Sequence, residues 1–144
     1  MDMSFIYNQE NAQSAIENSA KFLESDIRNL ILTGDERVVM LPQLYSIVAV
    51  WIKFHNLIAD NLKQIHPNLD NEAIFYETRR FVIAVYQNIW YNEVLPLILS
   101  SEVLVEHEII SSKSCFESSI DPSVSSEFVA SAARYFHNFI HDEY

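Results

Sequence analysis

An arginine and a histidine near the C-terminus are the residues whose types and spacing best suit chemistry. Arg134 and His137 lie three residues apart, so a helix would carry both on one face, in adjacent turns. A fixed cation beside an imidazole suits an anionic ligand that carries a metal ion. Spacing alone favours a plainer interpretation, in which His137 is a core histidine and Arg134 a structural arginine.

The segment around this pair is predicted to form one helix over about 125–140. Asp121-Pro122-Ser123 is typical of a helix entry, because proline tolerates the first turn and a short polar side chain can accept an orphan amide. Apolar residues then recur at steps of three and four, which predicts one buried stripe: Phe128, Ala132, Tyr135 and Phe139.

Two other groups of residues have spacings that suit a site. His137 and His141 are four apart, the spacing of a two-histidine metal pair on a helix. No clear third ligand accompanies them, so a zinc site is the weaker alternative. Glu77 and Glu93 could suggest paired carboxylates, but they lie sixteen residues apart and are better explained as anchoring partners of Arg79 or Arg80.

Composition excludes several classes of protein. The chain has 144 residues, which is the length of a single domain. Of these residues 49% are hydrophobic, which is enough for a core. Its formal charge of −11 makes nucleic acid and anionic membranes poor partners. A single glycine, Gly34, excludes a glycine-rich phosphate loop and favours a mainly α fold. No apolar run reaches membrane-spanning length, because charged residues interrupt the longest ones: Lys53, Asp60, Arg79 and Glu93.

Helical periodicity recurs before the C-terminal segment. We expect helices over about 12–27, 42–65 and 70–90, a break at Pro96 with a short helical turn that continues to Leu99, and an exposed serine-rich loop over 100–119. The second helix is predicted to turn six residues inward: Leu44, Ile47, Val48, Trp51, Ile58 and Leu62. The third is apolar on most sides, which predicts self-association through uncovered apolar helix faces.

Five blocks of the sequence, in this order, resemble animal haem peroxidases of the peroxinectin or chorion-peroxidase kind. They are Thr33 to Arg37, Trp51 to Ala59, Tyr76 to Ala84, Gln87 to Pro96, and Asp121 to His137. The resemblance implies one partial peroxidase domain, covering the middle of the family's longer catalytic domain. Its expected parts are a shortened N-terminal segment (1–33), a distal-arginine and core-helix region (34–99), a loop (100–120) and a proximal-histidine helix (121–144).

The resemblance assigns roles to individual residues. It implies that His137 is the proximal axial ligand of a haem iron and that Arg134 holds a haem propionate. Arg37 matches the distal arginine that polarises bound peroxide. Met40 stands where the family has a glutamate that forms an ester with haem. Because a thioether cannot form that ester, we expect haem b to be held weakly and without a covalent bond.

The first residues resemble a family segment that supplies part of a calcium site. Asp2 and Ser4 match ligand positions, but calcium needs about 6–8 oxygen ligands, so calcium binding is expected only in a more complete chain. The family's distal histidine would precede Met1. The family is secreted, whereas Met1 to Ser4 shows neither the basic region nor the apolar run of a signal peptide. His55 is expected to make structural hydrogen bonds.

Two classes of function follow from the resemblance. The first is a haem peroxidase that reduces hydrogen peroxide while oxidising a small donor, in the response to oxidative stress. This chain would then be an incomplete form of it with low activity, because the histidine that takes the peroxide proton is missing. The alternative is a non-catalytic peroxidase-like module that acts by binding or adhesion, or a truncated inactive product.

Overall fold

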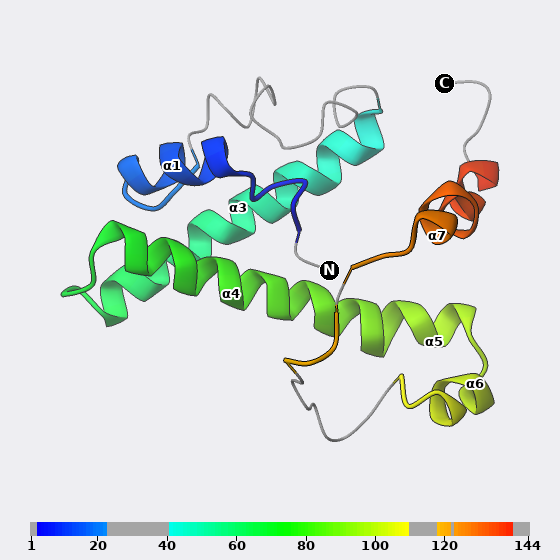
Figure 1. Cartoon of the computed structure of the whole chain (residues 1–144). Coiled ribbons are helices and arrows are strands. Elements are labelled where there is room, and N and C mark those ends of the chain that lie inside the picture. The colour runs from blue at the N-terminus through cyan, green and yellow to red at the C-terminus, as the bar shows by residue number, and fades with distance from the viewer. Residues whose placement is uncertain (1–2, 23–40, 110–117, 122, 140–144) are drawn as a thin grey trace. The chain divides into compact units, whose positions relative to one another are not determined.

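The computed structural model describes residues 3–22, 41–109, 118–121 and 123–139, and every regular element among them is a helix (Figure 1). The predicted mainly α fold is therefore confirmed. The chain divides into two compact units, Met1–Ile110 and Ser111–Tyr144. No helix in the described part is long and apolar enough to cross a membrane.

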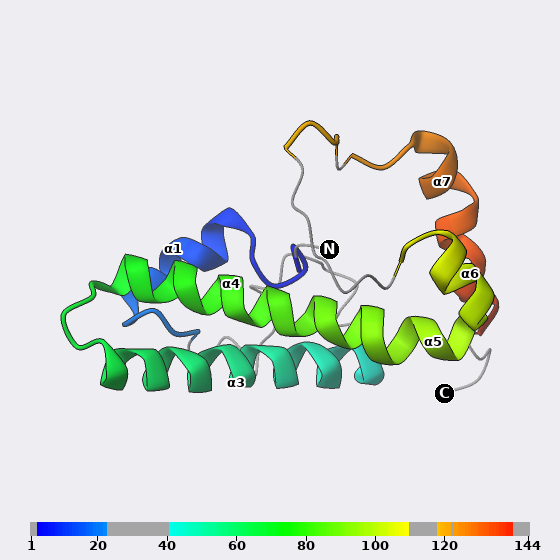
Figure 2. The same cartoon turned by 90° about the horizontal axis from the view of Figure 1, so that it is seen from below.

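Two long helices form the frame of the first unit. Helix α3 spans Pro42–Ile65 and α4 spans Asn71–Ile89, and they lie side by side (Figure 2). Proline at the start of α3 suits the first turn, where its missing N–H costs nothing. Asp70 caps α4 by accepting a 2.8 Å hydrogen bond from the amide of Ala73. Both predicted ranges are confirmed.

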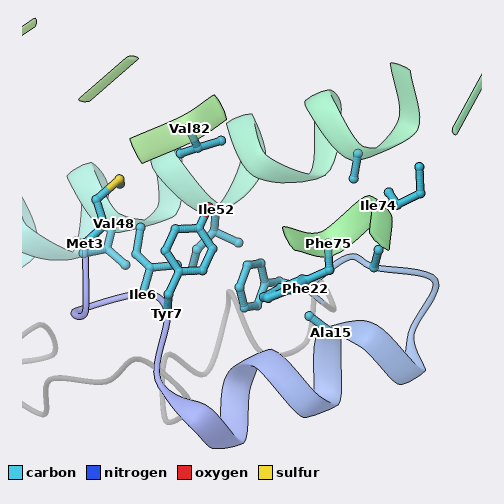
Figure 3. Packing of buried hydrophobic residues seen from close by; sticks show 12 residues of the cluster. Met3, Ile6, Tyr7, Ala15, Phe22, Val48, Ile52, Ile74, Phe75 and Val82 are labelled. Carbon is cyan, nitrogen blue, oxygen red and sulfur yellow. The ribbon is translucent and has the colours of Figure 1, made fainter. Parts of the chain in front are cut away.

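The N-terminal segment supplies the other half of the core. Helix α1 spans Gln9–Glu17, and the buried side chains of this segment pack against α3 and α4 (Figure 3). Full burial of a large apolar side chain contributes roughly 1.5–3 kcal/mol, and twelve buried residues form the cluster: Met3, Ile6, Tyr7, Ala15, Ala20, Phe22, Val48, Ile52, Ala59, Ile74, Phe75 and Val82.

The predicted helix over 12–27 is wrong at both ends. It begins earlier, where the side chain of Asn8 accepts a 2.7 Å hydrogen bond from the amide of Asn11. It ends at Glu17, and Ser19 and Ala20 then take positive φ angles of 58° and 65°. Two consecutive left-handed residues turn the chain away from the helix axis. Ala20 and Phe22 are therefore buried without being helical, and residues 23–27 lie outside the described ranges.

The predicted inward face of α3 is also partly wrong. The helix buries Val48, Ile52, His55 and Ala59, whereas Leu44 and Ile47 are 39% and 54% exposed. Helical spacing identifies a stripe, but α3 has apolar residues on more than one side. The packing partner decides which stripe is buried, and here a small alanine and a hydrogen-bonded histidine fit against the N-terminal segment.

Pro96 does not break the helical path as predicted. Helix α4 continues as a π-helix, η2 (Trp90–Val94), and then as α5 (Leu95–Ile98). In an α-helix, proline would clash with the carbonyl four residues earlier. The wider π turn, in which the amide of Leu95 donates to the carbonyl of Trp90, accommodates the ring without ending the helix.

The predicted serine-rich loop contains a helix. Helix α6 spans Ser101–Glu106, with Ser100 as its N-cap and Leu104 buried. Serine-rich composition favours a loop, but Ser100 is a helix N-cap, because its hydroxyl accepts a hydrogen bond from the amide of Val103. Residues 110–117 lie outside the described ranges.

The helix predicted over about 125–140 is not one continuous α-helix in the residues that the structure describes there, 123–139. Helix α7 spans Ser126–Ala130, and a 3₁₀ helix, η3, spans Ala132–Phe139. Ser125 is the cap, accepting from the amide of Phe128 at 3.2 Å. The side chain of Asp121 instead accepts a hydrogen bond from the amide of Ser123. This contact forms a turn and does not cap a helix. Between the helices, the hydroxyl of Ser131 donates to the carbonyl of Glu127 at 2.7 Å, a local bond that competes with helix continuation.

The stripe predicted to be buried on this segment is exposed where it is described. Phe128 and Tyr135 are 51% and 61% exposed, and Ala132 is exposed as well. The periodicity correctly indicated helical structure. It cannot specify what covers an apolar face, because burial depends on a second element.

Candidate functional site

The predicted haem-contacting pair lies on the 3₁₀ helix η3. With three residues per turn, positions 134 and 137 fall directly above one another on its face. The side chain of Arg134 is exposed, and its backbone amide donates to the carbonyl of Ser131 at 3.0 Å. Within the described ranges its guanidinium takes part in no ion pair. Only the backbone of His137 is described.

The remaining predicted site residues are largely outside the described ranges. Arg37, Met40, Asp2 and His141 fall there, so their predicted roles stay predictions. Ser4 is exposed and follows Met3, whose carbonyl accepts from the amide of Ile6 at 2.9 Å. Across the described segments, no three His, Cys, Asp or Glu side chains gather into a cluster that could hold a metal ion.

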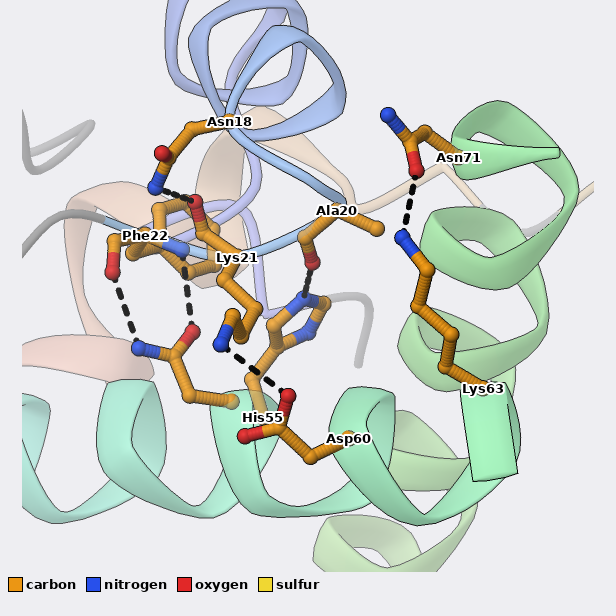
Figure 4. A network of polar contacts seen from close by, with 9 residues as sticks. Asn18, Ala20, Lys21, Phe22, His55, Asp60, Lys63 and Asn71 are labelled. Atoms are coloured by element: carbon orange, nitrogen blue, oxygen red, sulfur yellow. Dashed lines mark hydrogen bonds and ion pairs between the residues drawn. The ribbon is translucent and has the colours of Figure 1, made fainter. Parts of the chain in front are cut away.

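A buried histidine, His55, joins three parts of the first unit. It is 0% exposed, and its Nδ1 lies 2.9 Å from the Tyr7 hydroxyl. Its Nε2 lies 3.1 Å from the carbonyl oxygen of Ala20 (Figure 4). A carbonyl can only accept, so Nε2 must carry the proton. Nδ1 of the neutral ring then accepts from the tyrosine hydroxyl. The prediction that His55 makes structural hydrogen bonds is confirmed.

The electrostatics of this cluster keep its groups neutral. Burial lowers the pKa of His55 to about 4, despite the opposing hydrogen bond to Ala20. Burial also raises the pKa of Tyr7 well above its usual range, although the guanidinium of Arg79, 5.5 Å from the ring centroid, acts against it. Near neutral pH both groups are therefore neutral, and their hydrogen bonds join the N-terminal segment to α3.

Aromatic rings enclose His55. The ring centroids of Phe22, Phe75 and Tyr7 lie 4.9, 5.3 and 5.6 Å from that of the imidazole. Such pairs contribute about 0.5–1.5 kcal/mol each beyond area burial. The enclosure also excludes water, which explains the depressed pKa of His55.

Sequence analysis missed the role of the neighbouring residue, Asn56. Its side chain accepts from the amide of Phe22 at 2.9 Å and donates to the carbonyl of Phe22 at 2.8 Å. One turn further, Asp60 pairs with Lys21 at 3.0 Å (Figure 4). The only signal was that Asn56 follows His55 in a matched block. The predicted pairing of Glu77 with Arg80 is confirmed, at 2.8 Å.

These contacts fix both ends of the stretch that contains Arg37 and Met40. Phe22, before the stretch, is held on α3 by Asn56. Leu41, after it, is the N-cap residue of the same helix. Helix α3 therefore anchors the two points between which residues 23–40 run.

Comparison with known proteins assigns the chain to a family whose fold is mainly helical. The sequence model of the family "Animal haem peroxidase" matches residues 2–144. The chain belongs to the animal haem peroxidase family.

Individual relatives agree with this assignment. A peroxidase of Drosophila melanogaster is 38% identical over 114 residues, which cover 75% of this chain and 16% of the relative. Human dual oxidase 1 is 37% identical over 75% of this chain and 6% of its own length. Chorion peroxidase of Aedes aegypti is 32% identical over 74% of this chain and 14% of its own.

The chain thus spans a small part of the relatives that it matches, between 6% and 16% of the three named here. Family membership supports a peroxidase-like function and, in general, a haem cofactor. The activity and partners of a whole peroxidase do not transfer automatically to so short a stretch.

Proposed function

We propose that this chain is the part of a haem peroxidase domain that supplies the proximal ligand, His137, and the distal arginine, Arg37. The observation that carries the proposal is the placement of positions 134 and 137 one 3₁₀ turn apart, in a chain that matches the family over residues 2–144. Bound haem would supply the chemistry of peroxide reduction coupled to oxidation of a small donor.

The described residues fit an anionic porphyrin edge. Arg134 presents an exposed guanidinium without an ion-pair partner in the described ranges, and such a fork of donors suits a propionate. His137, one turn along, would then bind iron through a neutral imidazole. Arg37 would orient peroxide from another segment. With Met40 in place of glutamate, haem b would be held without an ester bond.

Haem titration followed by Soret absorbance tests this proposal. We expect His137→Ala to change the Soret spectrum and to weaken binding at least tenfold, and Arg134→Ala to weaken binding with little spectral change, since it removes a propionate contact only. His107→Ala is the matched control, because His107 is an exposed histidine in the other unit. Equal spectra and affinities for wild type and His137→Ala would refute the assignment.

Calcium, location and self-association complete the proposal. Asp2 and Ser4 would contribute to a calcium site only alongside further oxygen ligands, so added calcium should not raise the melting temperature of this chain. By family resemblance we propose a secreted location.

We also propose that the chain self-associates, because large apolar side chains of both long helices are exposed, among them Ile47, Val50, Leu57 and Phe81.

The second candidate is a non-catalytic peroxidase-like module. The same exposed apolar side chains favour it, since binding to a partner would remove them from water. Loss of haem binding with retained self-association would select this candidate.

A further inference from the structure

Two neighbouring arginines on α4 have different surroundings. Arg80 is exposed, and its guanidinium pairs with Glu77 of the same helix at 2.8 Å. Arg79 is partly buried and forms no ion pair within the described part of the chain. Its Nε is buried and has no hydrogen-bond partner among the described residues. Arg79 is therefore a cation without a counter-charge in these ranges, although the chain has 20 acidic residues against 9 basic ones.

The contact that Arg79 does make leaves its hydrogen-bond donors unsatisfied. The centroid of the Tyr7 ring lies 5.5 Å from its guanidinium carbon. The face of a ring attracts a cation, but it supplies no oxygen to accept the N–H groups. A charge taken out of water and a buried donor without an acceptor are both unfavourable. An anion with oxygen acceptors would relieve both.

A cavity of about 360 Å³ lies beside Arg79, where α1 packs on α4 (Figure 2). Three carboxamides line it with the guanidinium: Asn8, Gln9 and Gln13. The oxygen of Asn8 is engaged by the amide of Asn11, which leaves its NH₂ group to donate. Among the described residues that line the cavity none is acidic, so Arg79 carries the formal charge there.

The lining selects a small organic monocarboxylate. A guanidinium fork and carboxamide NH₂ groups match the two oxygens of a carboxylate. Aromatic and aliphatic side chains complete the wall and suit an apolar body: Tyr7, Tyr76, Ala12 and Ile16. The volume is near the lower end of the range of ligand sites, roughly 300–1,000 Å³. A single charge is favoured over a dianion such as phosphate, because the chain has a formal charge of −11.

We propose that Arg79 and this cavity form a binding site for a small organic monocarboxylate. The guanidinium is the anchor, and the carboxamides of Asn8 and Gln9 are further donors. Because Nε is covered, binding includes a small rotation of the arginine side chain toward the cavity. The site is independent of haem binding, since its residues all belong to the first unit and His137 belongs to the second.

Isothermal titration calorimetry with sodium benzoate tests the anchor, at an ionic strength held constant with sodium chloride. We expect Arg79→Gln to raise the dissociation constant by about tenfold or more, because it removes the charge and the fork. Arg79→Lys keeps the charge without the fork and should raise it by about threefold or more. Arg80→Gln is the matched control and should stay within about twofold, since Arg80 is exposed and pairs with Glu77. Sodium phosphate should bind more weakly than benzoate.

A surface variant keeps the test valid if substitutions of Arg79 disturb the fold. Gln9 is exposed and is the first residue of α1, where a carboxylate stabilises a helix. Gln9→Glu adds a negative charge to the cavity wall, so it should weaken benzoate binding by about tenfold while the circular dichroism spectrum stays unchanged.

Two results would overturn the proposed site. One is a wild-type chain that does not bind benzoate. In that case, a lower melting temperature of Arg79→Gln than of Arg80→Gln would identify a carboxylate of the protein itself as the partner of Arg79. The other is binding that Arg80→Gln weakens as much as Arg79→Gln does, since the anchor would then be general surface charge.

Discussion

The two units of the chain treat their apolar side chains differently. In the first, Ile74 and Phe75 of α4 are completely buried, and His55 among them has both ring nitrogens hydrogen-bonded. In the second, Phe128 and Tyr135 are more than half exposed. In the first unit, burial also holds His55 and Tyr7 neutral near pH 7. The unit that carries Arg134 and His137 lacks a described core.

This difference teaches that stability and the proposed haem chemistry rest on separate residues. A buried histidine such as His55 is an unsuitable iron ligand, because both of its ring nitrogens are engaged in hydrogen bonds within the core. An exposed helix face can accept a large flat cofactor, but it contributes little to folding by itself. Variants of the core residues and variants of Arg134 or His137 should therefore have separable effects.

The largest expected effect is the removal of a core ring. Phe75→Ala should lower the free energy of unfolding by about 3–5 kcal/mol, because it deletes a fully buried aromatic side chain and leaves a cavity. Phe128→Ala, in the second unit, should change it by less than about 0.5 kcal/mol. Urea unfolding followed by circular dichroism measures both, and comparable losses would erase the contrast between the units.

A second effect concerns pH. The pKa of His55 is about 4 in the folded chain and about 6.5 when unfolded, so the unfolded state binds the proton first as pH falls. The stability from the neutral imidazole is complete above the unfolded pKa and is lost progressively from about pH 6.5 down to pH 4. Between pH 7 and pH 5 the loss should be about 2 kcal/mol.

The control for this pH effect removes the titrating ring. His55→Gln should be less stable than wild type at pH 7, and its stability should fall less between pH 7 and pH 5. The difference between the two slopes isolates His55 from the many carboxylates of the chain. Parallel pH profiles would show that the imidazole is not held neutral in the core.

The smallest effect is the loss of the side-chain clamp on Phe22. Asn56→Ala removes two hydrogen bonds to the backbone of Phe22 and should cost about 1–3 kcal/mol. Asn61→Ala, an exposed asparagine on the same helix, is the control and should be nearly neutral. If the anchored stretch positions Arg37, Asn56→Ala should also slow peroxide turnover of the haem-loaded chain more than it weakens haem binding.

Sequence alone determined the class of fold and the bounds of the two long helices. Local signals decide these: Pro42 begins α3, the residue before Pro67 ends it, and Asp70 caps α4. The ordered blocks also identified the family, which the match over residues 2–144 confirms. The site residues followed from the same blocks and remain predictions.

Only the tertiary structure decided which faces are buried and what individual polar residues do. The buried stripe of α3 is Val48, Ile52, His55 and Ala59 because the N-terminal segment packs there. The clamp between Asn56 and Phe22 joins residues that are 34 positions apart, a distance over which local pattern carries no information. Periodicity records which side chains can share a face, whereas burial depends on a partner surface that folding supplies.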